Sequence, residues 1–329
     1  MFHRDVHCIG ASAGGVPALQ RLLSELPRDL PASVCIVLHT APITNSSLAS
    51  VLQKGCPLPV ITPQDDEPIE RGRVYIARPD HHLLLFRDRL RVVRGPRENR
   101  HRPAVDPLFR SAAWSLGPRV VGVVLTGMLD DGTAGLWAIK ACAGIAVVQD
   151  PLSAAFPSMP QNALNAVEID YCLPLDRIAA LLDELARQPV ASIPAPDRAD
   201  QFRIESEFAM LQRESRDMNL LQAKPTGFTC PSCHGALWEL TEGDLLRFRC
   251  HTGHAFGSES LQAAQSEALE EALYAALRAL EEKATASRRL AQHDGNRRPE
   301  ETARLEREAQ DLEERAELMR QLLGNKPAA

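Results

Sequence analysis

The stretch Gly10-Ala11-Ser12-Ala13-Gly14-Gly15 lies between a short apolar run, Val6 to Ile9, and a helical pattern, Val16 to Leu26. In a strand, glycine-rich turn and helix of this kind, the turn lifts its serine to the carboxyl edge of a sheet, where open α/β sheets bind ligands. The helix directs free backbone N–H groups and its positive dipole end to the same place, which stabilises an oxyanion. A nucleotide loop is the competing interpretation, but the glycine spacing fits neither G-x-G-x-x-G nor a loop ending in Gly-Lys-Ser/Thr.

Apolar runs and helical patterns alternate from residue 5 to about residue 187. Strands are predicted at Val34–Leu38, Val120–Leu125 and Ile145–Val148, and helices at Leu48–Lys54, Pro107–Ser115, Ala134–Cys142 and Pro174–Arg187. This order predicts an α/β fold with a doubly wound, mostly parallel sheet and helices on both faces. Three short strand patterns, Val74–Ala77, His82–Phe86 and Leu90–Val93, predict a small antiparallel hairpin inserted in that fold.

The composition argues against a nucleic-acid-binding protein and against a membrane protein. The chain has 329 residues, 44% of them hydrophobic and 24% charged, with a net charge of −6. The acidic balance argues against a general affinity for nucleic acid. No apolar run reaches the roughly 18 residues that span a bilayer, and the N-terminus lacks the form of a signal peptide. We therefore expect a cytoplasmic protein that does not insert into membranes.

Changes in composition divide the chain into four parts. Residues 1–188 carry the α/β pattern, and residues 189–224 form a proline-rich linker followed by a helix. Residues 225–258 form a compact cysteine and histidine module, and residues 259–329 are predicted to form a helical hairpin or coiled coil. In that last part, apolar residues recur at steps of three and four, which is the spacing of a coiled-coil seam. They are Leu269, Leu273, Leu277, Leu280, Leu305, Ala309, Leu312, Ala316, Met319 and Leu323. Two antiparallel helices, a dimer or a signalling partner would bury this stripe.

The eight cysteines fall into two groups. Cys8, Cys35, Cys56, Cys142 and Cys172 are scattered in or beside apolar runs and are expected to be buried as small hydrophobic residues. The other three cluster with histidines. The pair Cys230-Pro231-Ser232-Cys233, followed by Cys250-His251-Thr252-Gly253-His254, has the spacing of a structural zinc site. Cys230, Cys233, Cys250 and His254 are the predicted ligands of a zinc ribbon, with His251 and His234 as alternatives to His254.

Ser12 needs a base and the base needs a carboxylate. His39 ends the second buried strand, whose carboxyl end shares an edge with the first. Asp130 and Asp131 follow the strand Val120–Leu125. One aspartate is expected to cap a turn or helix, and the other to complete a triad of serine, histidine and aspartate.

Several separated motifs now point to one family. They are Gly10-Ala11-Ser12-Ala13-Gly14-Gly15, His39, Asn99-Arg100-His101-Arg102-Pro103-Ala104-Val105-Asp106, Leu125-Thr126-Gly127-Met128 with Asp131-Gly132, and Ser158-Met159-Pro160. With these motifs, residues 5–187 resemble the catalytic domain of the chemotaxis protein-glutamate methylesterases (CheB type). The resemblance implies a Ser12/His39/Asp131 esterase that needs no cofactor for catalysis, and it selects Asp131 over Asp130.

The resemblance also implies a substrate and its contacts. The substrate would be a methylated, chemoreceptor-like protein. Backbone N–H groups near Ala13 and Met128 would hold the oxyanion, and Arg102, in a basic loop, would meet a glutamate-rich receptor helix. The competing interpretation of that loop is a solvated charged turn that ends in a helix cap at Asp106.

The sequence departs from the family pattern at three places. Leu129 stands where the family motif has glycine, and Ala13 where it has threonine or a similar polar residue. Family members commonly carry a receiver domain before the esterase, and none precedes residue 5 here, so a switch in cis is not expected. Two alternative functions stay open: a protein-glutamine deamidase using the same triad, and a signalling adaptor whose esterase domain is silent.

Overall fold

The computed structural model describes residues 2–39, 48–190, 199–211, 218, 221–243, 245–294 and 298–324. Spatial contacts divide the chain into a compact unit that ends at Leu261 and a second unit that begins at Gln262. The predicted boundaries at residues 188 and 224 lie inside the first unit because the cysteine-rich module packs against the α/β part. Within the described ranges, every helix is too short or too polar to cross a membrane.

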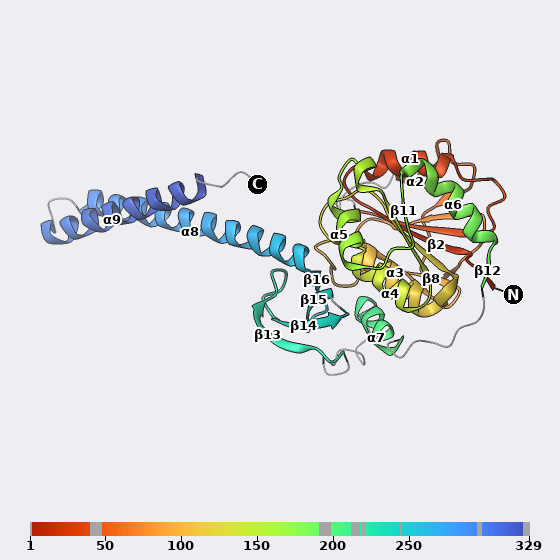
Figure 1. The fold of residues 1–329 in the computed structure, drawn as a ribbon. Coiled ribbons are helices and arrows are strands. Elements are labelled where there is room, and N and C mark those ends of the chain that lie inside the picture. Colours follow the sequence, from red (N-terminus) through yellow and green to blue (C-terminus); the bar gives the residue numbers. More distant parts are fainter. Residues whose placement is uncertain are drawn as a thin grey trace. The chain divides into compact units, whose positions relative to one another are not determined.

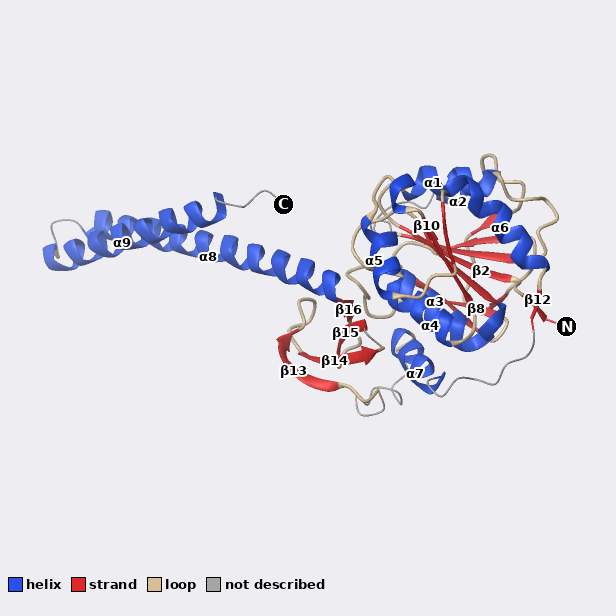
Figure 2. Cartoon of the chain, viewed as in Figure 1, coloured by secondary structure: helices blue, strands red, loops and turns tan. Residues whose placement is uncertain are grey.

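A seven-stranded sheet forms the centre of the first unit (Figure 2). Its strands, in spatial order, are β11 (Tyr171–Leu173), β10 (Ile145–Gln149), β9 (Val120–Val124), β2 (Val6–Ala11), β3 (Ser33–Leu38), β6 (Val74–Ile76) and β4 (Val60–Ile61). Every neighbouring pair in this sheet is parallel. The predicted parallel α/β sheet is confirmed.

Both faces of the sheet are covered by helices (Figure 1). Successive side chains of β2 alternate between two buried clusters, with Ile9 in one and Cys8 in the other. The first cluster includes leucines of α1 and α6, and the second includes side chains of α3, α4 and α5. The helices are α1 (Gly15–Ser24), α2 (Leu48–Gln53), α3 (Val105–Leu116), α4 (Thr133–Ala141), α5 (Ser158–Ala166) and α6 (Leu175–Arg187). Burial on both faces explains why the central strands are continuous apolar runs.

The winding of the sheet reverses beside β2. From β2 the chain adds β3, then the edge strand β4, and then β6 between these two, before it returns to add β9, β10 and β11 on the other side. The carboxyl ends of β2 and β9 therefore form the topological switch point, where ligands of open α/β sheets bind.

The region Arg73–Val93 was only partly predicted. Strands β7 (His82–Phe86) and β8 (Arg89–Val93) form the expected antiparallel hairpin, joined by β5 (Glu67–Pro68). Val74–Ile76, however, pairs in parallel with β3 and β4 in the main sheet, so its assignment to the inserted hairpin was wrong. A short apolar run does not show whether its partner is local or distant. Among the scattered cysteines, Cys172 is exposed, because β11 is an edge strand.

The linker begins with a strand. Strand β12 (Pro189–Val190) pairs with β1 (Phe2–His3). The remaining linker prolines, within 191–198, lie outside the described residues. Helix α7 (Ala199–Ala209) follows and buries Phe202 and Phe208.

The cysteine-rich module is a four-stranded antiparallel sheet. Its strands are β13 (Lys224–Thr229), β14 (Ala236–Glu242), β15 (Leu245–Cys250) and β16 (Ala255–Gly257). Strands β14 and β15 form a hairpin between the two cysteine motifs. We call residues 224–257 the ribbon.

The second unit is helical. Helix α8 (Ser258–Asp294) starts in the first unit and continues into the second, and α9 (Pro299–Gly324) lies antiparallel to it, with ion pairs Arg320–Glu281 and Arg288–Glu313. The predicted seam of α9 is buried at Leu305, Ala309, Leu312 and Ala316. The seam predicted for α8 is not fully buried, since Leu269 is 62% exposed. The reason is length, because α9 has 26 residues against 37 in α8.

Candidate active site and metal centre

Ser12 lies in the tight turn between β2 and α1, at the switch point of the sheet. Its N–H donates to Thr126 O at the end of β9 (3.0 Å), and its carbonyl accepts from Gly15 N (2.9 Å). Gly14 has φ 73°, in the left-handed region that favours glycine. These constraints present the hydroxyl at the carboxyl edge of the sheet.

His39 follows β3 and reaches Ser12. Its backbone N–H donates to Ala11 O (3.2 Å), which fixes the end of β3 beside β2. Ring atom Nδ1 lies 3.0 Å from Ser12 Oγ, and Nε2 lies 2.7 Å from Asp131 Oδ2. An ionised carboxylate can only accept, so the ring proton is on Nε2 and the lone pair of Nδ1 faces the serine hydroxyl. The structure therefore brings the three predicted triad residues into one hydrogen-bonded path.

Asp131 is buried at the N-terminus of α3. Its carboxylate accepts from the N–H groups of Val105 (2.7 Å) and Asp106 (3.1 Å), and from Asn99 Nδ2 (2.8 Å). Burial raises the pKa of Asp131, but the hydrogen bonds from His39, Val105 and Asn99 outweigh it and lower the pKa to about 2. Asp131 is therefore ionised at neutral pH and can stabilise an imidazolium.

Asn99 joins Asp131 to a second buried carboxyl group. Its Nδ2 also donates to Asp106 Oδ2 (2.7 Å), while Asp106 Oδ1 accepts from Gly132 N (3.0 Å) and Gly135 N (2.7 Å) at the start of α4. Burial and the nearby charge of Asp131 raise the pKa of Asp106 to about 7. Asp106 is thus a cap for α4. The cap that the sequence suggested for its own helix is not formed, because α3 begins at Val105 with Ala104 as its N-cap and Asp106 lies inside the first turn.

His101 covers the base. Its ring stacks on that of His39, with centroids 3.7 Å apart and 11° between planes. Burial, followed by the charge of His39, lowers the pKa of His101 to about 4, so this ring is neutral at pH 7. Sequence reasoning placed His101 in a basic loop and assigned no role to Asn99. The sequence pointed to Asn99 and His101 only because both belong to the motif Asn99-Arg100-His101-Arg102-Pro103.

The remaining predicted site residues lie at different distances from the chemistry. A Cβ built on Gly127 would lie 2.9 Å from Ser12 Cβ, so the chain runs directly past the serine just before Met128, which is 56% exposed. Ala13 follows Ser12 in the turn. Arg102 is different: its guanidinium pairs with Asp80 (2.5 Å) and donates to Gly95 O (2.6 Å), with 15% of the side chain exposed. Little of that cation is left to meet an anionic substrate.

The loop after β9 explains the family departure at Leu129. Leu129 has φ 63°, in the left-handed region that glycine favours. Its N–H donates to Ser158 Oγ (3.1 Å), and its carbonyl accepts from Asn162 Nδ2 (2.9 Å). These two bonds to α5 hold the leucine backbone in the loop that leads to Asp131. The carboxylate of Asp130 accepts from Glu259 N (3.0 Å) and Ser260 N (3.2 Å), so the predicted cap serves α8.

The four predicted metal ligands converge in the ribbon. The ligand atoms of Cys230, Cys233, Cys250 and His254 all lie within 4.8 Å of one another. The Sγ atoms of Cys233 and Cys250 are 3.6 Å apart, and His254 Nδ1 lies 3.6 Å from Cys250 Sγ and 3.8 Å from Cys230 Sγ. A tetrahedral zinc with bonds of about 2.3 Å to sulfur has edges of roughly 3.8 Å, so the donor set fits zinc.

The two alternative histidines are not in this cluster. The ring of His251 lies 6.5 Å from that of Trp238 and the residue is exposed. His234 is also exposed, with φ 60° in the turn after Cys233. The geometry favours His254 as the fourth ligand.

Comparison with known proteins agrees with the geometry. The sequence profile of the family described as CheB methylesterase matches residues 7–182. A Leptospira interrogans protein whose name contains the words protein-glutamate methylesterase/protein-glutamine glutaminase is 38% identical over 178 residues, covering 54% of this chain and 92% of that protein. A Rhizobium johnstonii protein with those words in its name is 42% identical over 178 residues, covering 53% of this chain and 48% of its own length.

A solved structure shows the same fold. The crystal structure of the Thermotoga maritima CheB methylesterase catalytic domain superposes with a TM-score of 0.53 at 32% identity, covering 55% of this chain and 98% of that one. The resemblance predicted from the separated motifs is confirmed, and the chain belongs to the CheB methylesterase family.

Proposed function

We propose that this chain is a protein-glutamate methylesterase, with Ser12 as nucleophile, His39 as base and Asp131 as the group that orients His39. The observation that carries the proposal is the path from Ser12 Oγ to His39 Nδ1 (3.0 Å) and from His39 Nε2 to Asp131 Oδ2 (2.7 Å). Nucleophile, base and orienting acid are within hydrogen-bond reach at the switch point of the sheet, as covalent catalysis requires.

The reaction proceeds in two balanced steps. His39 takes the proton of Ser12 as Oγ attacks the ester carbonyl, and the imidazolium then returns a proton to the leaving oxygen, so methanol departs from an acyl-serine. Water, deprotonated by His39, attacks the acyl-serine, and the imidazolium returns that proton to Ser12 Oγ as the bond to the acyl group breaks, which releases glutamate and free Ser12. Asp131 stays ionised throughout and stabilises the imidazolium, because its carboxylate accepts from donors that do not leave.

The oxyanion would be held by backbone N–H groups. Ala13 follows Ser12 in the turn and Met128 follows Gly127, which abuts Ser12. Both positions supply N–H groups whatever their side chains, so the alanine at position 13 does not remove a donor. Removing one such donor costs about 10²–10³ in rate in other hydrolases.

The substrate proposed is a methylated, chemoreceptor-like protein met in the cytoplasm. The support is the names of the relatives, which specify a glutamate methyl ester on a protein. The exposed side chains of Met128 and Phe156 offer an apolar surface near Ser12 to such a substrate, since Gly14 packs against Phe156 and Gly127, which precedes Met128, packs against Ser12.

Methanol release tests the proposal. The full chain and its Ser12→Ala variant are incubated with the methylated cytoplasmic part of a chemoreceptor, and methanol is measured. We expect the variant to lose activity by about 10⁶-fold while its circular dichroism is unchanged. Equal methanol release by both proteins would refute the role of Ser12.

Amide hydrolysis is a second candidate, because the names of the relatives also include protein-glutamine glutaminase. The same triad cleaves a glutamine side chain if ammonia, rather than methanol, is the leaving group. Ammonia release from an unmethylated receptor measures this activity. A chain that releases neither product, and whose Ser12 resists a fluorophosphonate, would instead be an adaptor with a silent esterase domain.

The ribbon is proposed to hold one structural zinc ion on the thiolates of Cys230, Cys233 and Cys250 and on Nδ1 of His254. A full set of four protein ligands stabilises the fold and leaves no site for substrate on the metal. We expect one zinc per chain by elemental analysis, and loss of that zinc in Cys233→Ser. One zinc in the variant as well would contradict this ligand set.

The helices α8 and α9 are proposed to bind a signalling partner or a second copy. The support is the part of the predicted seam that α8 leaves exposed at Leu269. Sedimentation of the full chain and of Leu269→Glu tests self-association. If the full chain and Leu269→Glu have equal masses at all concentrations, Leu269 does not mediate self-association, and the proposed partner is a different protein.

A further inference from the structure

The segment Ala255–Ser260, from the end of the ribbon to the first turn of α8, contacts the loops that hold the catalytic acid. We propose that this segment is a positioning element of the active site, which fixes Asp131 through Asn99 and Asp130. The inference rests on the proposed esterase function. It also goes beyond the family, since the family profile ends at residue 182 and these contacts come from outside it.

The first set of contacts runs through Asn99. The N–H of Asn99 donates to Ala255 O (2.8 Å), and its Oδ1 accepts from Gly257 N (2.8 Å). Ala255 N in turn donates to Arg97 O (3.4 Å), so the loop pairs with β16 much as another strand would. The ribbon sheet thereby extends to the loop that supplies Asn99 to the triad.

The chemistry of these groups fixes the orientation of the Asn99 amide. A backbone N–H can only donate, so Gly257 requires the oxygen of the amide to face it. The NH2 group then faces Asp131 Oδ1 (2.8 Å) and Asp106 Oδ2 (2.7 Å), both of which accept. Asn99 is 3% exposed, so water does not replace a lost partner. If the hydrogen bond from Gly257 N is lost, fewer hydrogen bonds fix the orientation of the Asn99 side-chain amide, which donates to Asp131.

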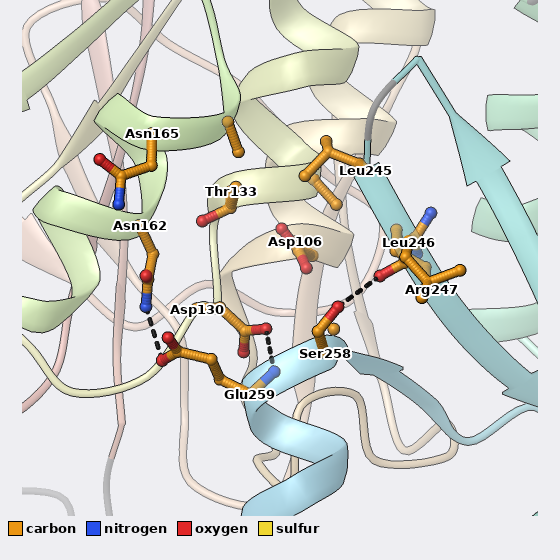
Figure 3. Close-up of a pocket in the computed structure, with 13 residues that line it drawn as sticks. Asp106, Asp130, Thr133, Asn162, Asn165, Leu245, Leu246, Arg247, Ser258 and Glu259 are labelled. Carbon is orange, nitrogen blue, oxygen red and sulfur yellow. Dashed lines mark hydrogen bonds between the residues drawn. The ribbon is translucent and has the colours of Figure 1, made fainter.

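The second set of contacts runs through Asp130 (Figure 3). Its carboxylate accepts from Glu259 N (3.0 Å), Ser260 N (3.2 Å) and the Ser260 hydroxyl, at the N-terminus of α8. Negative charge is stabilised at a helix N-terminus, and here the charge belongs to the residue directly before Asp131. A Cβ on Gly257 would lie 2.2 Å from Asp130 Oδ2, so the segment that holds Gly257 and the loop that holds Asp130 meet without room for a side chain at position 257.

Asn162 of α5 also links the loop at Leu129 to the first turn of α8. Asn162 of α5 donates both to Leu129 O (2.9 Å) and to Glu259 Oε2 (2.7 Å), as Figure 3 shows for the second contact. A pocket of about 210 Å³ remains between these residues and β15. Segment Ala255–Ser260 therefore contacts Asp130 directly, Leu129 through Asn162, and Asn99 directly. Asp131 follows Asp130 in the chain and accepts from Asn99, so both attachments act on it.

His254 connects this element to the metal centre. It directly precedes Ala255, and its carbonyl accepts from Cys250 N (2.9 Å). The residue that first contacts Asn99 thus directly follows a proposed zinc ligand. Folding of the ribbon around its metal would then set the register in which β16 meets the Asn99 loop.

Two variants of the full chain test the inference, with labelling of Ser12 by a fluorophosphonate and turnover of 4-nitrophenyl acetate as readouts. Asn99→Gly removes the amide but keeps a residue suited to φ 48°. Gly257→Ala forces β16 away from Asp130. Loss of a hydrogen bond to a charged group corresponds to roughly 10- to 100-fold, so we expect labelling and kcat to fall by that factor with KM unchanged.

Gly227→Ala is the matched control, because it makes the same change in the same sheet where a Cβ meets nothing within 4 Å. We expect it to label at the rate of the unaltered chain. Since Gly257 acts in part through Asn99, the double variant should lose less than the product of the two single losses. Thermal unfolding verifies that each variant is folded, and if Gly257→Ala is not, Ser260→Ala replaces it, with labelling slowed at least about 3-fold.

Labelling at the unaltered rate in Asn99→Gly, or in a folded Gly257→Ala, would overturn the inference and leave the proposed esterase standing. A labelling loss in Gly227→Ala equal to that in Gly257→Ala would also overturn it, because the ribbon would then act through general stability. Failure of the unaltered chain to label would instead overturn the proposed hydrolase, and this inference with it. These probes do not depend on the natural substrate, so the two failures are distinguishable.

Discussion

Glu205 of α7 is the centre of a buried cluster of charges, and Glu205→Gln tests what holds the ribbon to the α/β part. Its carboxylate contacts Arg247 Nη2 (2.8 Å) and Arg249 Nη2 (2.7 Å) of β15, and lies 3.6 Å from Arg110 Nη1 of α3. Glu98 adds the second carboxylate, 2.9 Å from Arg110. The side chains of this cluster are at most 3% exposed.

The expected loss follows from this burial. The substitution keeps the shape of the side chain but leaves three guanidinium groups with Glu98 as the remaining carboxylate of the cluster. Burial raises the pKa of Glu205, but the three cations outweigh it and hold the pKa well below its usual range, so the glutamate is charged at neutral pH. Breaking a buried ion pair by removing one partner costs about 3–5 kcal/mol, and we expect a loss of that size in the free energy of unfolding.

The control is Glu207→Gln, the same change two residues along the same helix. Glu207 pairs with Arg203 (2.6 Å) at side-chain exposures of 15% and 38%, where a pair contributes about 0.2–1 kcal/mol. Urea unfolding of the full chain at pH 7, followed by tryptophan fluorescence, measures both variants. Trp137 packs edge-on against Phe202 of α7 and so reports on this region. A loss for Glu205→Gln no larger than that for Glu207→Gln would refute the reasoning.

Three further predictions concern the site and its acid stability. Gly127→Ala should slow fluorophosphonate labelling of Ser12 at least about 10-fold, because the new Cβ would lie 2.9 Å from that of Ser12; an unchanged rate would contradict the close approach. Leu129→Gly should label within about twofold of the unaltered chain, since φ is already 63°; a large gain would show that leucine distorts the loop. Burial lowers the pKa of His7, and likewise that of His101, to about 4, so the unfolded chain binds more protons between pH 6.5 and 4 and stability falls as pH drops through that range. For His7 the loss is about 3 kcal/mol, and urea unfolding of His7→Leu at several pH values should show a shallower decline.

The triad could be predicted because parallel sheets place strand ends together. Ser12, His39 and Asp131 each follow a buried apolar run, and strands of that kind have their carboxyl ends on one edge. The resemblance to the family then selected Asp131 from two adjacent aspartates. No knowledge of side-chain contacts was needed for these assignments.

Asn99 and His101 were harder because they lie on a loop without periodicity. Their roles depend on contacts with residues distant in sequence, such as the bond from Asn99 to Asp131, 32 residues away, and that from Gly257 to Asn99, 158 residues away. The same limit explains Leu269, where spacing predicts a buried stripe but does not give the length of the partner helix. Local sequence patterns predict which helix or strand a segment forms, but they do not predict which distant segment packs against it.

The adjacent aspartates show why loop 127–132 keeps its shape with leucine at a glycine position. A non-glycine residue in the left-handed region costs roughly 1–2 kcal/mol, which other contacts must offset. Here Leu129 is held on both sides of its backbone by α5, Asp130 is held by the first turn of α8, and Asp131 is held by the first turn of α3. Three helices thus fix three consecutive residues. The attachments of Asp130 and Asp131 use N–H groups that are otherwise unpaired in the first turns of α8 and α3, and Leu129 is held by two side chains of α5. The strained conformation therefore persists, and the carboxylate beside His39 stays in place.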